Sequence, residues 1–131
     1  LAEASLPVNE KLVARGAFTF QSGYDALRAW ARSGRLPDAV FAADDNTAFG
    51  VVDAARELGI AVPEKLAVIG FDDHPFAATS HPPMSSVRQP AEEMGALGVE
   101  MLREMLGARP ARATTVVLKP RLVLRATTRP Q

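Results

Sequence analysis

The sequence predicts an α/β fold in which helices flank an open parallel sheet. Residues 39–43 and 66–71 are continuous apolar runs, as expected of strands that are covered on both faces. Segments with helical spacing follow the strand candidates, and this alternation is typical of a parallel sheet. The chain has 131 residues, of which 47% are hydrophobic, so it has enough apolar side chains for one core.

The first part of the chain is expected to form one strand and one helix. Residues 1–6 have the character of a helix tail that Pro7 interrupts, which suggests a start inside a larger protein. Residues 12–14 are a short apolar strand candidate. Helical spacing then runs over residues 22–33, and Gly34 ends it.

The centre of the chain repeats this order. After the strand at 39–43, Asp45 is a suitable N-cap for a helix that ends at Gly59. The turn at Val62 and Pro63 leads into the strand at 66–71. One side of the central helix carries apolar residues at helical intervals, namely Ala48, Phe49, Val52, Ala55 and Leu58.

The last third of the chain predicts a strand, a long helix and two marginal strands. Residues 85–88 are a strand candidate, and Pro90 opens an amphipathic helix whose apolar side is rich in methionine and leucine. The branched residues of 114–118 and 122–127 suit two short strands at the sheet margin.

Composition excludes several classes of protein. Fifteen basic residues balance fifteen acidic ones, so the chain lacks the excess positive charge that non-specific binding to nucleic-acid phosphates needs. It has no cysteine, which excludes disulfides and thiolate metal sites. No apolar run approaches the roughly 20 residues of a membrane helix, and residues 1–10 do not have the pattern of an export signal. We therefore expect a cytoplasmic protein without a membrane partner.

Candidate ligand contacts lie where the predicted strands end. In an open parallel sheet, ligands bind beyond the carboxyl ends of the strands. This rule selects Phe18, Asp44, Asp72 and Gln89, one residue from each of four loops. Carboxylates and a carboxamide hydrogen-bond in fixed directions, and an aromatic ring covers the apolar face of a sugar. The set therefore predicts a small, hydroxyl-rich ligand.

Structural roles compete with ligand contact at several of these loops. Asp45 suits a helix cap, Asp73 suits a cap for the turn at 74–78, and Phe20 suits the core. Asp44 and Asp72 differ, because each follows an apolar strand so closely that an unpaired carboxylate would be costly. We expect those two carboxylates to contact ligand.

The sequence predicts no enzyme, cofactor or metal site. It lacks the G-x-S-x-G elbow, the phosphate-binding loop and the H-E-x-x-H helix. His81 lies beside two prolines, far from other metal ligands, and indicates a structural loop. An alternative is a magnesium-dependent phosphoryl-transfer enzyme that uses the aspartates at two strand ends, but no lysine lies at an obvious strand end to neutralise a phosphoryl group.

Several stretches resemble the lactose and galactose repressor family of bacterial transcription regulators. The resemblance is carried by residues 37–45 (PDAVFAADD) with 48–50 (AFG), 62–73 (VPEKLAVIGFDD), 81–90 (HPPMSSVRQP), 93–95 (EMG) and 122–128 (LVLRATT). It covers nearly the whole chain, in the family's order and spacing.

This resemblance implies part of a two-lobed, periplasmic-binding-protein-like sensor behind a helix-turn-helix domain that is missing here. Residues 1–90 would form the C-terminal lobe, 91–110 a helix that packs in the missing N-terminal lobe, and 111–131 the return crossover and final strands. The apolar side of residues 91–106 would then be exposed, or swapped between two chains. DNA would be bound only through the missing domain.

The resemblance also assigns roles to individual residues. Asp72 matches the family's effector-binding aspartate, Gln89 a crossing residue near the pocket, and Phe18 a stacking aromatic. Asp44 departs from the usual asparagine, and its charge would disfavour anionic effectors such as sugar phosphates. The implied effector is a sugar or a related polyol.

A homodimer is the last implied feature, with its two-fold contact at Phe49, Val52 and Ser80. The alternative from another class is the sugar-binding component of an import system, which shares the fold and would need an export signal.

Overall fold

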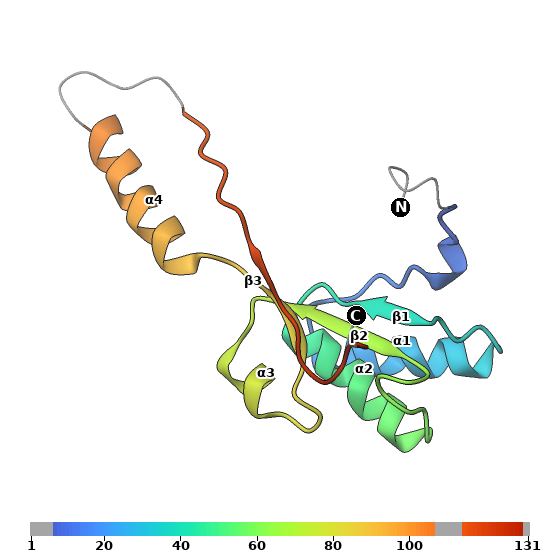
Figure 1. Ribbon diagram of the computed structural model, residues 1–131. Helices are drawn as coiled ribbons and strands as arrows, with labels where there is room; N and C mark the ends of the chain where they lie inside the picture. The colour runs from blue at the N-terminus through green and yellow to red at the C-terminus, as the bar shows by residue number, and fades with distance from the viewer. Residues whose placement is uncertain (1–6, 107–113, 130–131) are drawn as a thin grey trace.

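A four-stranded sheet organises the chain in the computed structural model, which describes residues 7–106 and 114–129 (Figure 1). The strand order is β1-β2-β3-β4; the first three strands are parallel to one another, and β4 is antiparallel to β3. The strands are β1 (Ala39–Phe41), β2 (Ala67–Phe71), β3 (Ser85–Arg88) and β4 (Arg121–Val123). The helices are η2 (Glu10–Leu12), α1 (Phe20–Arg32), α2 (Asp45–Glu57), α3 (Pro75–Thr79) and α4 (Ala91–Met105).

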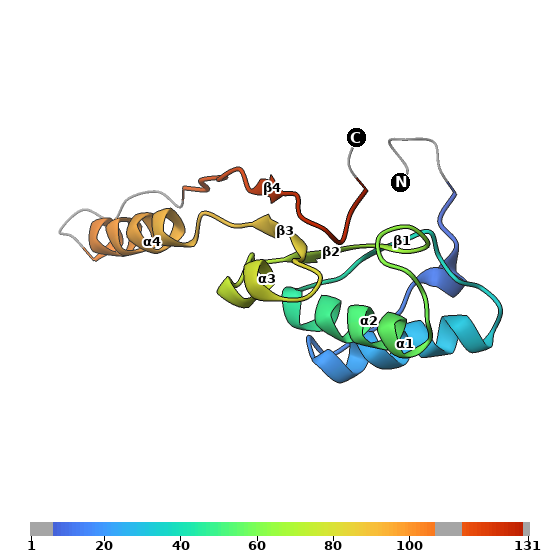
Figure 2. The same ribbon diagram turned by 60° about the horizontal axis from the view of Figure 1, so that its bottom comes forward.

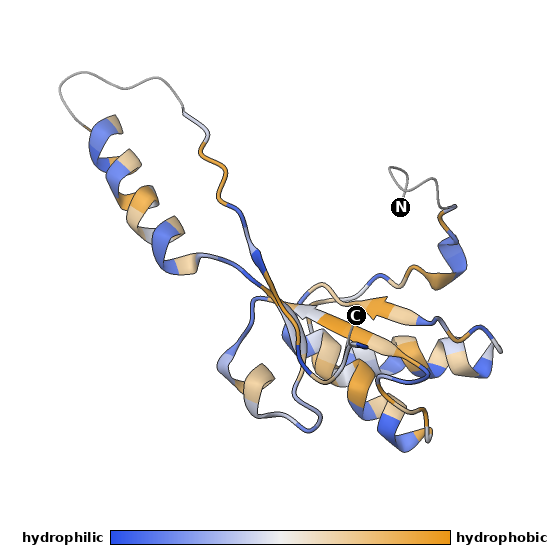
Figure 3. Cartoon of the chain, viewed as in Figure 1, coloured by the Kyte–Doolittle hydropathy of each residue, from blue (hydrophilic) through white to orange (hydrophobic). Residues whose placement is uncertain are grey.

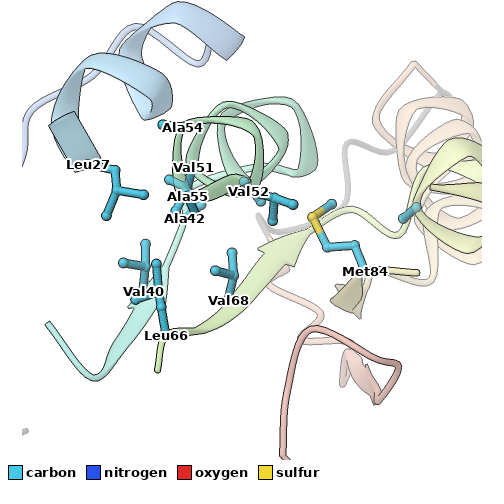
Figure 4. Packing of buried hydrophobic residues seen from close by; sticks show 12 residues of the cluster. Leu27, Val40, Ala42, Val51, Val52, Ala54, Ala55, Leu66, Val68 and Met84 are labelled. Atoms are coloured by element: carbon cyan, nitrogen blue, oxygen red, sulfur yellow. The ribbon is translucent and has the colours of Figure 1, made fainter. Parts of the chain in front are cut away.

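Helices α1 and α2 cover one face of the sheet (Figure 2). Side chains alternate between the two faces of a strand, so Val40 points toward these helices and is buried, whereas Phe41 points away and is 66% exposed. The core lies between the helices and the sheet, as Figure 4 shows. Its buried apolar residues are Leu27, Val40, Ala42, Ala48, Val51, Val52, Ala54, Ala55, Leu66, Val68, Ala77 and Met84.

Two glycines allow α1 and α2 to approach each other closely. A Cβ atom on Gly50 would lie 1.9 Å from the carbonyl oxygen of Phe20, and one on Gly23 would lie 2.0 Å from the carbonyl oxygen of Thr47. Real Cβ atoms do not approach other atoms so closely, so any other residue at either position would separate the helices. The close contact lies in the N-terminal halves of both helices.

Helix α4 and the return segment 114–120 project away from the sheet, and we call them the arm (Figure 1). No residue of α4 is buried, and Val99 and Leu102 are 68% and 59% exposed. Figure 3 shows apolar residues along both parts of the arm. The apolar side of this helix is therefore not covered by the described part of the chain, and both expectations for residues 91–106, exposure and exchange with a second chain, stay predictions.

The sequence placed most helices and strands correctly, and two strands wrongly. The predicted helices became α1, α2 and α4, and the predicted inner strands became β1, β2 and β3. Residues 12–14 form no strand, since η2 occupies the start of that segment, and residues 114–118 form none either. Of residues 122–127, only the first two belong to β4. The predicted helix tail at 1–6 lies outside the described residues.

Candidate functional site

The carboxyl ends of β1, β2 and β3 meet at one edge of the sheet, because these strands are parallel and in register. Asp44 follows β1, Asp72 follows β2 and Gln89 follows β3, so all three lie at that edge. Phe18 precedes α1, and the side-chain amide of Asn46, in α2, reaches its carbonyl oxygen at 3.5 Å. The predicted site residues therefore share an edge of the fold.

Asp72 and Gln89 are in direct contact. The Gln89 amide Nε2 donates a hydrogen bond to Oδ1 of Asp72. Asp72 is exposed, and its φ of 97° lies in the left-handed region that residues other than glycine rarely adopt. The two residues form an exposed pair of hydrogen-bonding groups at the ends of neighbouring strands.

Asp44 is the N-cap of α2, a role that the sequence assigned to Asp45. Its Oδ1 accepts the backbone N–H of Thr47 at 2.8 Å, and its own backbone is extended. The predicted cap at Asp45 was wrong, because Asp45 is the first helical residue and its carboxylate is buried. Asp44 is half-buried, and ligand contact by it stays a prediction.

Phe18 is 67% exposed and has a φ of 55°. It lines a cavity of about 590 Å³, next to Trp30 and Phe41. Gln89 lines a second cavity, of about 450 Å³, between β2 and the arm. Neither of these two cavities is lined by Asp44 or Asp72, so the four predicted residues share one edge of the sheet without lining a common cavity.

Beneath Asp72 lies a buried polar cluster that sequence reasoning missed. Oδ1 of Asp45 accepts the hydroxyl of Ser86 at 2.6 Å, and its Oδ2 accepts the backbone N–H of His74 at 2.7 Å. Asp45 is 1% exposed, and this burial raises the pKa of its carboxyl, although both hydrogen bonds oppose the effect. The only signal in the sequence was the second aspartate of the Asp44-Asp45 pair.

Asp73 belongs to the same cluster and pairs with two arginines. Its Oδ1 lies 2.7 Å from Nη1 of Arg125, and its Oδ2 pairs with Arg88. Burial tends to raise the pKa of this carboxyl, but the hydrogen bonds and charges of Arg125 and Arg88 outweigh burial and lower it. The predicted cap for the turn at 74–78 was wrong, because α3 begins without a side-chain cap.

The geometry disfavours a magnesium centre at the four aspartates. Asp45 accepts two hydrogen bonds and Asp73 pairs with two arginines, which leaves neither carboxylate open to a cation. Over residues 7–106 and 114–129, no group of three or more histidine, cysteine or acidic side chains is placed to hold a metal ion. None of the helices in those segments has the length and apolar character needed to cross a membrane.

The residues predicted for a dimer contact lie around α2 and α3. Phe49 is half-buried and packs against Phe76, with ring centroids 4.6 Å apart. Val52 is in the core and keeps only 9% of its surface exposed. Ser80 donates its hydroxyl to the carbonyl of Pro82 at 2.8 Å. The dimer contact itself stays a prediction.

Comparison with known proteins identifies similar chains. A sequence model of the periplasmic binding protein-like domain family matches residues 1–128. The HTH-type transcriptional regulator reg1 of Streptomyces lividans is 40% identical over 127 residues, which are 97% of this chain and 36% of that protein. The HTH-type transcriptional repressor PurR of Photorhabdus laumondii is 36% identical over 125 residues, 95% of this chain and 37% of that protein. The chain thus spans little more than a third of these relatives.

Solved structures of transcriptional regulators match the fold of this chain. The CelR transcriptional regulator in complex with cellobiose has a TM-score of 0.84 at 36% identity, over 96% of this chain and 38% of that chain. A LacI family transcriptional regulator from Lactobacillus casei with bound sucrose has a TM-score of 0.81 at 31% identity, over 97% of this chain and 47% of that chain. The proteins named in these comparisons are transcription regulators rather than enzymes.

Proposed function

Because this chain belongs to the family of periplasmic binding protein-like domains, in the form carried by LacI-family transcriptional regulators, we propose that it senses an effector for a bacterial repressor. The helix-turn-helix domain that contacts DNA would lie in a part of the protein outside this chain. Such a regulator acts where the chromosome is, so we place it in the cytoplasm.

The observation that carries this proposal is the exposed Asp72–Gln89 pair at the edge of the parallel sheet. A carboxylate beside a carboxamide offers both acceptors and donors, which suits the hydroxyl groups of a sugar or polyol. Two similar regulators were solved with cellobiose and with sucrose. We therefore propose that the effector is a neutral, sugar-like molecule held by Asp72 and Gln89, with Phe18 and Asp44 as further contacts.

The remaining parts of the chain have proposed roles in assembly. Phe49, Val52 and Ser80 would lie at the two-fold contact of a homodimer. The exposed apolar side of α4 would be covered by the N-terminal lobe of the complete protein, or by a second chain in its absence. On this proposal residues 1–90 are the C-terminal lobe, 91–110 the helix that enters the other lobe, and 111–131 the return.

Asp72→Ala in the product of the complete gene tests the effector site. Binding of that protein to DNA fragments flanking its gene is measured with and without cellobiose and sucrose. We expect Asp72→Ala to remove any response to the sugar while DNA binding in its absence is unchanged. The matched control is Asp53→Ala, which removes a carboxylate that pairs with Arg56 on the surface of α2. A sugar response that survives Asp72→Ala contradicts the proposed site.

A further inference from the structure

Two consecutive residues after β2 hold an unfavourable backbone conformation. Asp72 has a φ of 97° and Asp73 a φ of 54°, and neither is glycine. Such a conformation persists only where the surrounding structure over-determines it. The turn formed by residues 72–74 therefore needs specific contacts, and these contacts decide where the Asp72 carboxylate points.

The contacts that hold the turn come from α2 and β3. The backbone N–H of Asp73 donates to Oγ of Ser86 at 3.0 Å, and the Ser86 hydroxyl donates in turn to Oδ1 of Asp45. The N–H of His74 donates to Oδ2 of Asp45. Thus Asp45 and Ser86 accept both backbone N–H groups that follow Asp72, and we call these two residues the relay.

The relay is enclosed on all sides. Asp45 and Ser86 are 1% and 0% exposed, so water does not replace these hydrogen bonds. A Cβ atom on Gly70 would lie 2.2 Å from Oδ1 of Asp45, so the backbone of β2 packs directly against the carboxylate. A buried carboxylate with two donors in fixed directions is a rigid support for the turn.

We propose that Asp45 and Ser86 are positioning residues, which hold the turn of residues 72–74 in its left-handed form and so keep the Asp72 carboxylate beside Gln89. That the relay affects ligand binding rests on the proposed function. That the relay holds the shape of the turn is independent of the proposed function and is tested separately.

The first experiment measures amide hydrogen exchange in the 131-residue chain. Ser86→Ala removes the acceptor of the Asp73 N–H, so we expect this amide to exchange about tenfold faster, as loss of one buried hydrogen bond implies. The Ala42 N–H, which donates to Ile69 in the sheet, reports on general loosening. Faster exchange at Asp73 relative to Ala42 supports the relay, and an equal change at both overturns it.

Ser85→Ala is the matched control. Ser85 is the neighbouring buried serine of β3, but its hydroxyl contacts Arg125 and Thr128 rather than the turn. We expect this variant to leave the exchange rate of the Asp73 amide, relative to that of the Ala42 amide, as it is in the parent chain. Asp45→Ala adds a second check, because it removes the acceptor of the His74 N–H and leaves the Ser86 acceptor of the Asp73 N–H in place. We expect the His74 amide to exchange faster relative to the Ala42 amide, and unchanged protection at His74 would count against the relay.

The second experiment uses the complete gene product with cellobiose and sucrose. On the proposed function, Ser86→Ala weakens the response to whichever sugar acts by about tenfold and leaves DNA binding unchanged. If Asp72→Ala abolishes the response while Ser86→Ala has no effect, the relay has no role in ligand binding and the proposed function stands. If neither variant alters the response, the proposed function fails. The role of Asp45 and Ser86 in holding the turn is then decided by the hydrogen-exchange experiment.

Discussion

Gly70→Ala is the sharpest test of how the buried cluster is packed. The added methyl group would lie 2.2 Å from Oδ1 of Asp45 and 3.1 Å from its Cα atom. The first distance is shorter than any real contact of a Cβ atom, so the carboxylate has to rotate or β2 has to move away from α2. Rotation would take the oxygen away from the Ser86 hydroxyl.

The expected cost follows from two terms. Overpacking of a well-filled interior costs about 1–3 kcal/mol. Loss of a hydrogen bond to a charged acceptor costs about 1.5–3 kcal/mol, since the Ser86 hydroxyl stays buried without its partner. The two costs are not additive, because rotation of the carboxylate relieves the steric clash while it breaks the hydrogen bond. We therefore expect Gly70→Ala to lower the free energy of unfolding by about 3 kcal/mol, a large share of a typical total.

Urea denaturation followed by circular dichroism measures this change. The control is Gly98→Ala in α4, where an added Cβ atom meets nothing within 4 Å. Alanine is the better helix former, so this control leaves stability unchanged or raises it by up to about 1 kcal/mol. In an Asp45→Ala background, Gly70→Ala should cost less, because the methyl group then meets no carboxylate oxygen. An unfolding midpoint equal to that of the parent chain would refute this account of Gly70.

Three further predictions concern the core, the helix contact and pH. Leu27→Ala removes a fully buried side chain and should destabilise the chain by about 2–5 kcal/mol in the same assay. Gly50→Ala places a Cβ atom 1.9 Å from the Phe20 carbonyl oxygen and should lower the melting temperature measured by calorimetry, whereas Gly95→Ala, with open space around it, should not. The lowered pKa of Asp73 means that its ionised form adds stability above pH 3.8, which is lost as the pH falls through that lowered pKa. Asp73→Asn should therefore be less stable at neutral pH and lose less stability on acidification, and parallel losses in both proteins would contradict this.

The alternation of strands and helices was predictable because it depends on local patterns. Continuous apolar runs correctly predicted β1 and β2. Helices α1 and α2 end, as expected, just before Gly34 and Gly59, and both glycines have a left-handed backbone conformation. The start of α2 was displaced by one residue, because Asp44 and Asp45 are equally good caps in sequence. Contacts of Asp45 with His74 and Ser86, far along the chain, decide between them.

The wrongly predicted strands fail for a related reason. Residues 12–14 and 114–118 are apolar or branched, but a strand exists only where a partner strand supplies its hydrogen bonds. Sequence periodicity does not identify that partner. The strand candidates near the two ends of the chain were therefore the least predictable part of the fold, whereas β1, β2 and β3 were placed well.

At the candidate site, the sequence identified the exposed groups and missed their support. Two aspartate pairs follow β1 and β2, and in each pair the second carboxylate is buried: Asp45 accepts hydrogen bonds, and Asp73 pairs with arginines. The sequence predicted a structural role for the second member of each pair, but as a helix cap. Long-range contacts, such as that of Arg125 with Asp73, show what the structural role is.

The charge left at the edge of the sheet follows from this division. Both guanidinium groups of the cluster, on Arg88 and Arg125, are paired with Asp73 and are not available to neutralise a bound anion. In the segments that the structure describes, neither Asp44 nor Asp72 forms an ion pair. An anionic ligand would meet two carboxylates without compensation, and repulsion in a partly desolvated site is costly. The charges at this edge therefore fit the neutral, hydroxyl-bearing effector of the proposed function better than they would fit a sugar phosphate.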